Sequence, residues 1–242
     1  MTARARAAPW SAFVLHRYDW SESSLILDLF TREGGRVAAA AKGAKRPTSQ
    51  YRSVLLPFQQ LHVGLVRRGQ DDSNDVQTLR HAEWAGGSPI LRDDALFRGF
   101  YLNELVMKLL PRGDAHPTLF DAYAQALAAL AQSRGLSDRA HAAVRAFEMT
   151  LLRDVGWLPD LTVVTATQAR LQPLEHYVLR SDGGMVAADA GHDAIAGEHW
   201  LRMHAALLDR AHDELRHVCE VTVGPLRAML RSVLALHLGH VE

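Results

Sequence analysis

Residues 12–58 most constrain the fold, because strand-like apolar segments lead directly into a basic, proline-broken loop. Three runs rich in Val, Leu, Ile and Phe, at 12–18, 24–31 and 36–41, are separated by the short polar breaks that hairpins use. Between residues 32 and 52 the chain has six Lys and Arg side chains against the single acid Glu33. This pattern is typical of a small β-barrel that can hold a polyanion.

Two further strand-like segments follow the basic loop, at 58–66 and 76–83, with a polar turn between them at 67–75. Five strands in about eighty residues is the count of a small Greek-key barrel of the oligonucleotide-binding (OB) kind. An SH3-like barrel uses a similar count, so the number of strands alone leaves both open.

The spacing of apolar residues becomes helical from Asp93 onward. A stripe containing Phe97, Phe100, Leu105 and Leu109 predicts the inward face of a first helix. Further helices are expected after Pro117, from Ser137 as the N-cap, over 198–217 and after Gly224.

The stretch 156–197 is irregular apart from one hairpin pattern, YVLR-SDGG-MVAA. The expected fold class is therefore α+β, with a five-stranded OB β-barrel followed by an α-helical domain. We place the barrel at 1–84 and the helical domain at 85–242, with a small hairpin insertion at 156–196.

The formal net charge of zero hides two halves of opposite sign. Residues 1–84 contain 12 Lys and Arg against 8 Asp and Glu, whereas residues 85–242 contain 15 against 19.

The single Cys219 excludes an intrachain disulfide framework and suits a reducing cytoplasm. The sequence has no uncharged stretch long enough to cross a bilayer, so we expect no membrane span. It also lacks a phosphate-binding loop and a nucleophile elbow, so we expect no enzymatic activity, no small-molecule substrate and no cofactor.

Several collinear segments resemble the RecO family of recombination mediators. The run AFVLHRYDWSESSLILDLFTREGGRVAAAAKGAKRP, then LLPFQQL and TLRHAEW, resembles the family's N-terminal barrel. GFYLNELVMKLL and VRAFEMTLLRDVGWLPDL resemble its helical segments. Many relatives bind structural zinc through four cysteines, but Val164, Thr167, Ala187 and Ala190 occupy those places here and none can ligate zinc. The resemblance thus implies a zinc-less variant with no metal site.

The resemblance also implies a function in the RecFOR pathway of DNA repair and recombination. A RecO-like protein is expected to bind single- and double-stranded DNA and to anneal complementary strands. With RecR and the single-stranded-DNA-binding protein it would promote RecA loading at gaps, in the cytoplasm at the nucleoid. The alternative is a protein-interaction adaptor whose barrel docks a partner protein and binds DNA weakly.

Cations in and near the basic loop are the candidate DNA contacts. They are Arg17, Arg36, Lys42, Lys45, Arg46 and Arg52, with Arg4 and Arg6 in the N-terminal arm. The alternative is a solvated loop whose charges confer solubility. Among the aromatic residues, Phe13, Phe30 and Phe58 are expected in the core, Tyr51 offers a ring beside the loop, and Tyr18 and Trp20 remain unassigned.

A second candidate site comes from the family resemblance. Arg145 occupies a basic position that, with Phe147 and Leu151, implies a site for the acidic C-terminal tail of the single-stranded-DNA-binding protein. The alternative is that Arg145 pairs with Glu148 or Glu104 on a solvated helix face.

Overall fold

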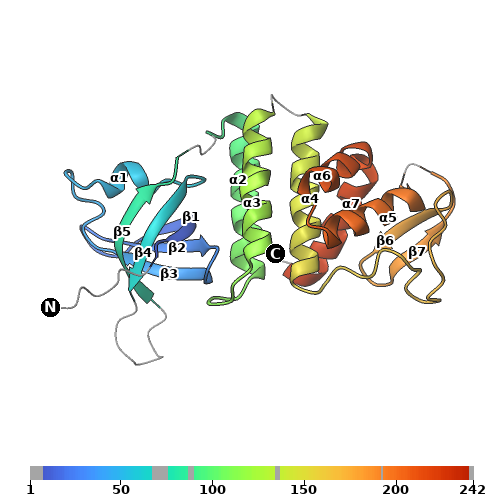
Figure 1. The fold of residues 1–242 in the computed structure, drawn as a ribbon, viewed down its shortest axis with the longest axis horizontal. Coiled ribbons are helices and arrows are strands. Elements are labelled where there is room, and N and C mark those ends of the chain that lie inside the picture. Colours follow the sequence, from blue (N-terminus) through green and yellow to red (C-terminus); the bar gives the residue numbers. More distant parts are fainter. Residues whose placement is uncertain (1–7, 67–75, 87–89, 134–136, 192, 240–242) are drawn as a thin grey trace. The chain divides into compact units, whose positions relative to one another are not determined.

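The computed structural model describes residues 8–66, 76–86, 90–133, 137–191 and 193–239, and its ribbon is shown in Figure 1. The chain forms two compact units. The first unit comprises Met1–Leu91 with Gly99–Leu127, and the second comprises Arg92–Arg98 with Ala128–Glu242. The expected polar turn at 67–75 lies outside the described residues. Within the described ranges, no helix combines the length and the apolar character that crossing a membrane requires.

Five strands of the first unit close into a barrel in the order β1-β2-β3-β5-β4. Their bounds are Trp10–Asp19 (β1), Leu25–Thr31 (β2), Gly35–Ala41 (β3), Gln60–Val66 (β4) and Val76–Trp84 (β5). All neighbouring strands pair antiparallel except β3 and β5, where Ala38 to Ala40 pair in parallel with Val76 to Thr78. A short helix, α1 (Tyr51–Val54), lies between β3 and β4 along the chain. This closed, mixed barrel confirms the expected OB fold.

The middle of β1, Ala12 to Leu15, and most of β2 are buried on both faces, which explains why these segments are nearly continuous apolar runs. The face inside the barrel contributes Ala12, Val14, Leu27 and Leu29 to the core. The opposite face packs on α3 (Pro117–Gln132), where the ring of Phe120 lies 5.2 Å from that of Phe13 and 5.4 Å from that of Phe30. Phe13, Phe30 and Phe58 are buried, as predicted.

Helix α2 spans Asp93–Leu109, but the prediction of its inward face was wrong for two residues. The side chains of Phe97 and Phe100 are 73% and 46% exposed. The buried face instead includes Leu102, Leu105, Val106 and Leu109. Both faces of this helix carry apolar residues, so the helical period could not choose between them.

The first unit also contains a buried polar contact between the barrel and the helices. The Nδ2 amide of Asn103 donates to the carbonyl of Leu15 at 2.9 Å, and its Oδ1 accepts the hydroxyl of Tyr123. Burial raises the pKa of Tyr123, so its hydroxyl remains a donor at neutral pH. This network holds α2 and α3 against β1.

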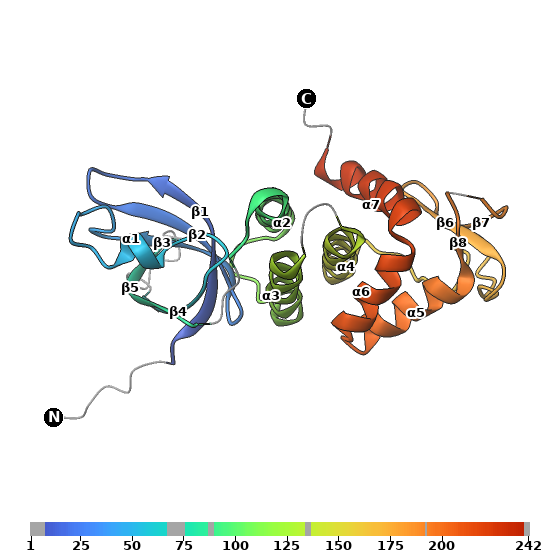
Figure 2. The same ribbon diagram turned by 90° about the horizontal axis from the view of Figure 1, so that it is seen from above.

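The second unit is mainly helical (Figure 2). Its helices are α4 (Asp138–Asp154), α5 (Gly197–Leu208), α6 (His212–Val221) and α7 (Val223–Leu238). Ser137 caps α4 as expected, since its side chain accepts the backbone N–H of Ala140 at 3.3 Å. The expected hairpin is present as β6 (His176–Arg180) and β7 (Gly184–Ala188), and β8 (Ile195–Ala196) extends it to a sheet of order β7-β6-β8.

Candidate nucleic-acid interface

A groove of about 880 Å³ opens on the barrel beside the C-terminal end of β1. Its lining residues are Arg17, Tyr18, Asp19, Leu25, Ala44, Lys45, Tyr51 and Arg52. The ladder between β1 and β4 covers Trp10 to Phe13, and the later residues His16 to Asp19 are all exposed. The end of β1 therefore forms one wall of the groove, and the basic segment before and within α1 forms the other.

The basic loop is a folded turn rather than a loose arm. Gly43 has a φ of 69°, a left-handed conformation that favours glycine, and its carbonyl accepts the N–H of Arg46 at 3.2 Å. The N–H of Lys45 donates to the carbonyl of Ser23 at 2.9 Å, and the side chain of Ala44 is buried. These contacts fix the backbone that carries Lys45 at the groove.

Three of the six predicted cations line the groove, namely Arg17, Lys45 and Arg52. The guanidinium of Arg17 donates to the carbonyl of Leu55 at 3.2 Å, which ties the two walls together. The Nζ atom of Lys45 lies 3.2 Å from the Oδ1 atom of Asp19. Three cations against one acid leave the groove with net positive charge.

The remaining predicted cations lie elsewhere. Lys42 and Arg46 are exposed on the same loop but are not among the lining residues. The arm residues Arg4 and Arg6 lie outside the described residues.

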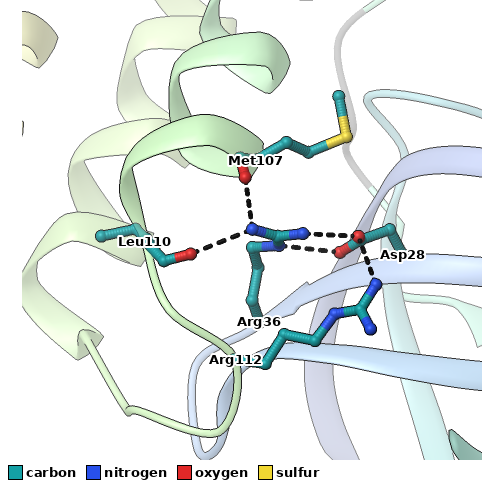
Figure 3. Close-up of polar contacts among 5 residues, drawn as sticks. All are labelled: Asp28, Arg36, Met107, Leu110 and Arg112. Carbon is teal, nitrogen blue, oxygen red and sulfur yellow. Dashed lines mark hydrogen bonds and ion pairs between the residues drawn. The ribbon is translucent and has the colours of Figure 1, made fainter. Parts of the chain in front are cut away.

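Arg36 has a structural environment instead (Figure 3). Its Nε and Nη2 atoms donate to the Asp28 carboxylate at 3.1 and 2.9 Å, and the side chains of Arg36 and Asp28 are only 14% and 1% exposed. Its Nη1 atom donates to the carbonyls of Met107 and Leu110 at the C-terminal end of α2, where a cation also complements the helix dipole. Arg112 adds a further contact to Asp28 at 3.4 Å. Because these contacts occupy the guanidinium of Arg36, we leave it out of the interface.

Sequence reasoning missed Asp19 and left Tyr18 unassigned, although both line the groove. Neither has a sequence signal of its own, because their position depends on how the basic loop folds back towards the end of β1. A signal did exist for Arg36: Asp28 interrupts the apolar run LILDLF, and a buried carboxylate requires a cationic partner.

The second unit contains a cluster of cations around His141. Arg145 pairs with the fully buried Glu148, with Nη2 and Oε1 2.8 Å apart, and Arg98 Nη2 lies 3.2 Å from His141 Nε2. Burial lowers the pKa of His141, and the neighbouring guanidinium groups of Arg98, Arg227 and Arg145 lower it further. Among the described residues, the buried Nε atoms of Arg145 and Arg98 have no hydrogen-bond partner. The cluster thus combines positive charge with buried donors that lack a partner among the described residues.

Arg145 does pair with Glu148, as the alternative interpretation supposed, but its side chain is only 11% exposed, so the pair is not on a solvated face. The apolar residues predicted beside it, Phe147 and Leu151, are core residues that are 1% and 0% exposed. A peptide cannot contact them without repacking the unit.

The region where the resemblance places the zinc ligands of relatives is held together by hydrogen bonds. The N–H of Val164 donates to the carbonyl of Ala169 at 2.8 Å, and Thr165 exchanges two bonds with Met185, at 2.9 Å through its backbone and 2.8 Å through its Oγ1. Across the part of the chain that is described, no three His, Cys, Asp or Glu side chains gather as metal ligands. The residues present do not fit zinc.

Comparisons with known proteins match both parts of the chain. The family model for the recombination protein O N terminal matches residues 10–87, and the model for the recombination protein O C terminal matches residues 94–242. The chain is 46% identical over 240 residues to the DNA repair protein RecO of Polaromonas sp. (strain JS666), covering 98% of this chain and 93% of that protein. It is 45% identical over 241 residues to the DNA repair protein RecO of Verminephrobacter eiseniae, covering 99% and 94%. The chain therefore belongs to the RecO family of DNA repair proteins.

Proposed function

We propose that this protein is a recombination mediator that binds DNA through the barrel groove and acts without making or breaking covalent bonds. It binds single- and double-stranded DNA, anneals complementary strands and, with RecR and the single-stranded-DNA-binding protein, promotes RecA loading at gaps. It works in the cytoplasm at the nucleoid and needs no cofactor.

The observation that carries this proposal is the convergence of Arg17, Lys45 and Arg52 on one groove of an OB barrel. Cations that follow phosphates, together with aromatic rings in the same groove, are the features that such barrels use for single strands. Lys42 and Arg46 extend the positive field along the same exposed loop. Annealing then has a physical basis, because holding two strands on a cationic surface lowers their mutual repulsion.

The proposed tail site is the cation cluster around Arg145. A C-terminal carboxylate can accept hydrogen bonds from guanidinium groups, and Arg98 and Arg145 both place theirs at this cluster. Arg227 is exposed at the same cluster, where an acidic tail can reach it. The single-stranded-DNA-binding protein covers single-stranded DNA, so tethering to its tail raises the local concentration of the mediator on that DNA.

The direct test is a charge reversal of both walls, Lys45→Glu with Arg52→Glu, in the full-length protein. Oligonucleotide binding and annealing of complementary strands by the purified protein should both be strongly reduced. Arg170→Glu reverses one exposed cation in the second unit, away from the groove, and serves as a control that should behave as wild type.

Two outcomes would contradict the proposal. Unchanged binding in the double variant would remove the groove from the DNA interface. Annealing by the wild-type protein that requires an added protein partner would favour the adaptor function.

A further inference from the structure

Tyr18 is an exposed aromatic residue at the groove. Its side chain is 46% exposed and lines the groove beside Arg17, Lys45 and Arg52. The ring of His16, two residues earlier on the same strand, lies 4.4 Å from the Tyr18 ring at an angle of 58°. Residues two apart on a strand project from the same face, so His16 supports the Tyr18 ring from one side.

The second tyrosine of the groove has a different role. Tyr51 packs against the barrel core, and its hydroxyl donates to the carbonyl of Arg80 at 3.1 Å. Burial also raises its pKa. Tyr51 is therefore part of the wall, with its hydroxyl already bonded. The exposed rings of Trp20 and Trp84 are not among the lining residues.

The surroundings of Tyr18 suit an unpaired base more than a base pair. Lys45 and Arg52 line the same groove as the Tyr18 ring, so a nucleotide bound there has cations for its phosphate and an aromatic ring for its base. Stacked duplex bases hide their faces from such a ring, whereas each base of a single strand exposes one. Asp19 offsets part of the charge of Lys45, so attraction for phosphates alone is reduced and the ring contributes more to binding.

We propose that Tyr18 is a base-stacking platform that makes the groove selective for unpaired bases over a bare sugar-phosphate backbone. This inference rests on the proposed DNA binding at the groove and adds that the groove recognises the exposed face of an unpaired base.

The test compares three probes of equal length: a thymidine oligonucleotide, an oligonucleotide of abasic sites with the same phosphates, and a blunt duplex. The wild-type protein should bind the thymidine strand more tightly than the abasic strand. Tyr18→Ala should weaken binding to the thymidine strand by about 5-fold or more and leave the abasic strand and the duplex unchanged. Tyr18→Phe keeps the ring and should bind as wild type, and Trp84→Ala is the control for an exposed aromatic residue outside the groove.

The outcomes separate this inference from the proposal beneath it. Equal affinity of the wild-type protein for thymidine and abasic strands, or a thymidine preference that survives Tyr18→Ala, would overturn the stacking role while leaving DNA binding intact. Failure of the wild-type protein to bind any of the three probes would instead refute DNA binding itself, and the stacking role with it. A loss of binding to all three probes in Tyr18→Ala alone would show a general defect and also overturn the inference.

Discussion

Replacing Asp28 by alanine would remove the carboxylate at the centre of the network in Figure 3. The carboxylate is 1% exposed and accepts two hydrogen bonds from Arg36, whose side chain is 14% exposed. Removing one partner of a buried ion pair leaves an uncompensated charge, which costs about 3–5 kcal/mol. The carbonyls of Met107 and Leu110 still accept from Arg36, so we expect the lower part of that range.

The assay is urea unfolding followed by far-UV circular dichroism and tryptophan fluorescence, because two compact units can unfold in separate transitions. Asp28→Ala should lower the free energy of unfolding of the transition that belongs to the first unit. Asp121→Ala is the matched control, since Asp121 pairs with Arg32 at 2.9 Å in similar geometry but with side chains that are 43% and 48% exposed. It should lose far less stability.

A double-mutant cycle with Arg36→Met sharpens this test. Replacing both charges by apolar groups removes the unpaired charge, so the double variant should be more stable than Asp28→Ala alone. The reasoning fails if Asp28→Ala loses no more stability than Asp121→Ala, or if the effects of Asp28→Ala and Arg36→Met are additive.

Two further predictions concern the second unit. Arg227→Ala should weaken binding of an acidic tail peptide, measured by fluorescence anisotropy, while oligonucleotide binding stays unchanged. Arg145→Ala should weaken peptide binding in the same way but also lower stability, because it removes the ion pair between Arg145 and the buried carboxylate of Glu148. Unchanged peptide affinity in both variants would remove the cluster from the tail site. The lowered pKa of His141 means that the unfolded chain takes up a proton more readily, so stability should fall as the pH falls below the unfolded value of about 6.5. His141→Gln should flatten that dependence in thermal unfolding scans, and an identical pH profile would contradict it.

The barrel could be predicted from the sequence because its apolar runs and polar breaks are local signals. The burial of Ala12 to Leu15 in β1 and of β2 on both faces even appears in the sequence, as apolar runs without alternation. The inward face of α2 could not be predicted, since the exposed Phe97 and Phe100 are as apolar as the residues that pack. Local pattern gives a helix its period, but tertiary packing selects its buried face.

The candidate site was predictable only in part. The charges of its residues can be read from the sequence, but the positions of their side chains depend on the tertiary structure. Lys45 and Arg52 were expected from the basic loop, and the folded turn brings them to a common groove with Arg17. Arg36 looked equivalent in sequence, but strand register places it beside Asp28, since Arg36 pairs with Phe30 and Asp28 lies two residues earlier on β2. Tyr18 could not be assigned from the sequence, because it lines the groove only once the basic loop folds towards the end of β1.

The central claim is that the cations of the groove contact phosphates, and the salt dependence of oligonucleotide affinity tests it most directly. The logarithm of the affinity should fall linearly with the logarithm of salt concentration, and each lost phosphate contact should reduce the slope by about 0.7 for single strands. Lys45→Glu with Arg52→Glu should therefore give a clearly shallower slope than wild type or Arg170→Glu. An unchanged slope in the double variant would contradict the account.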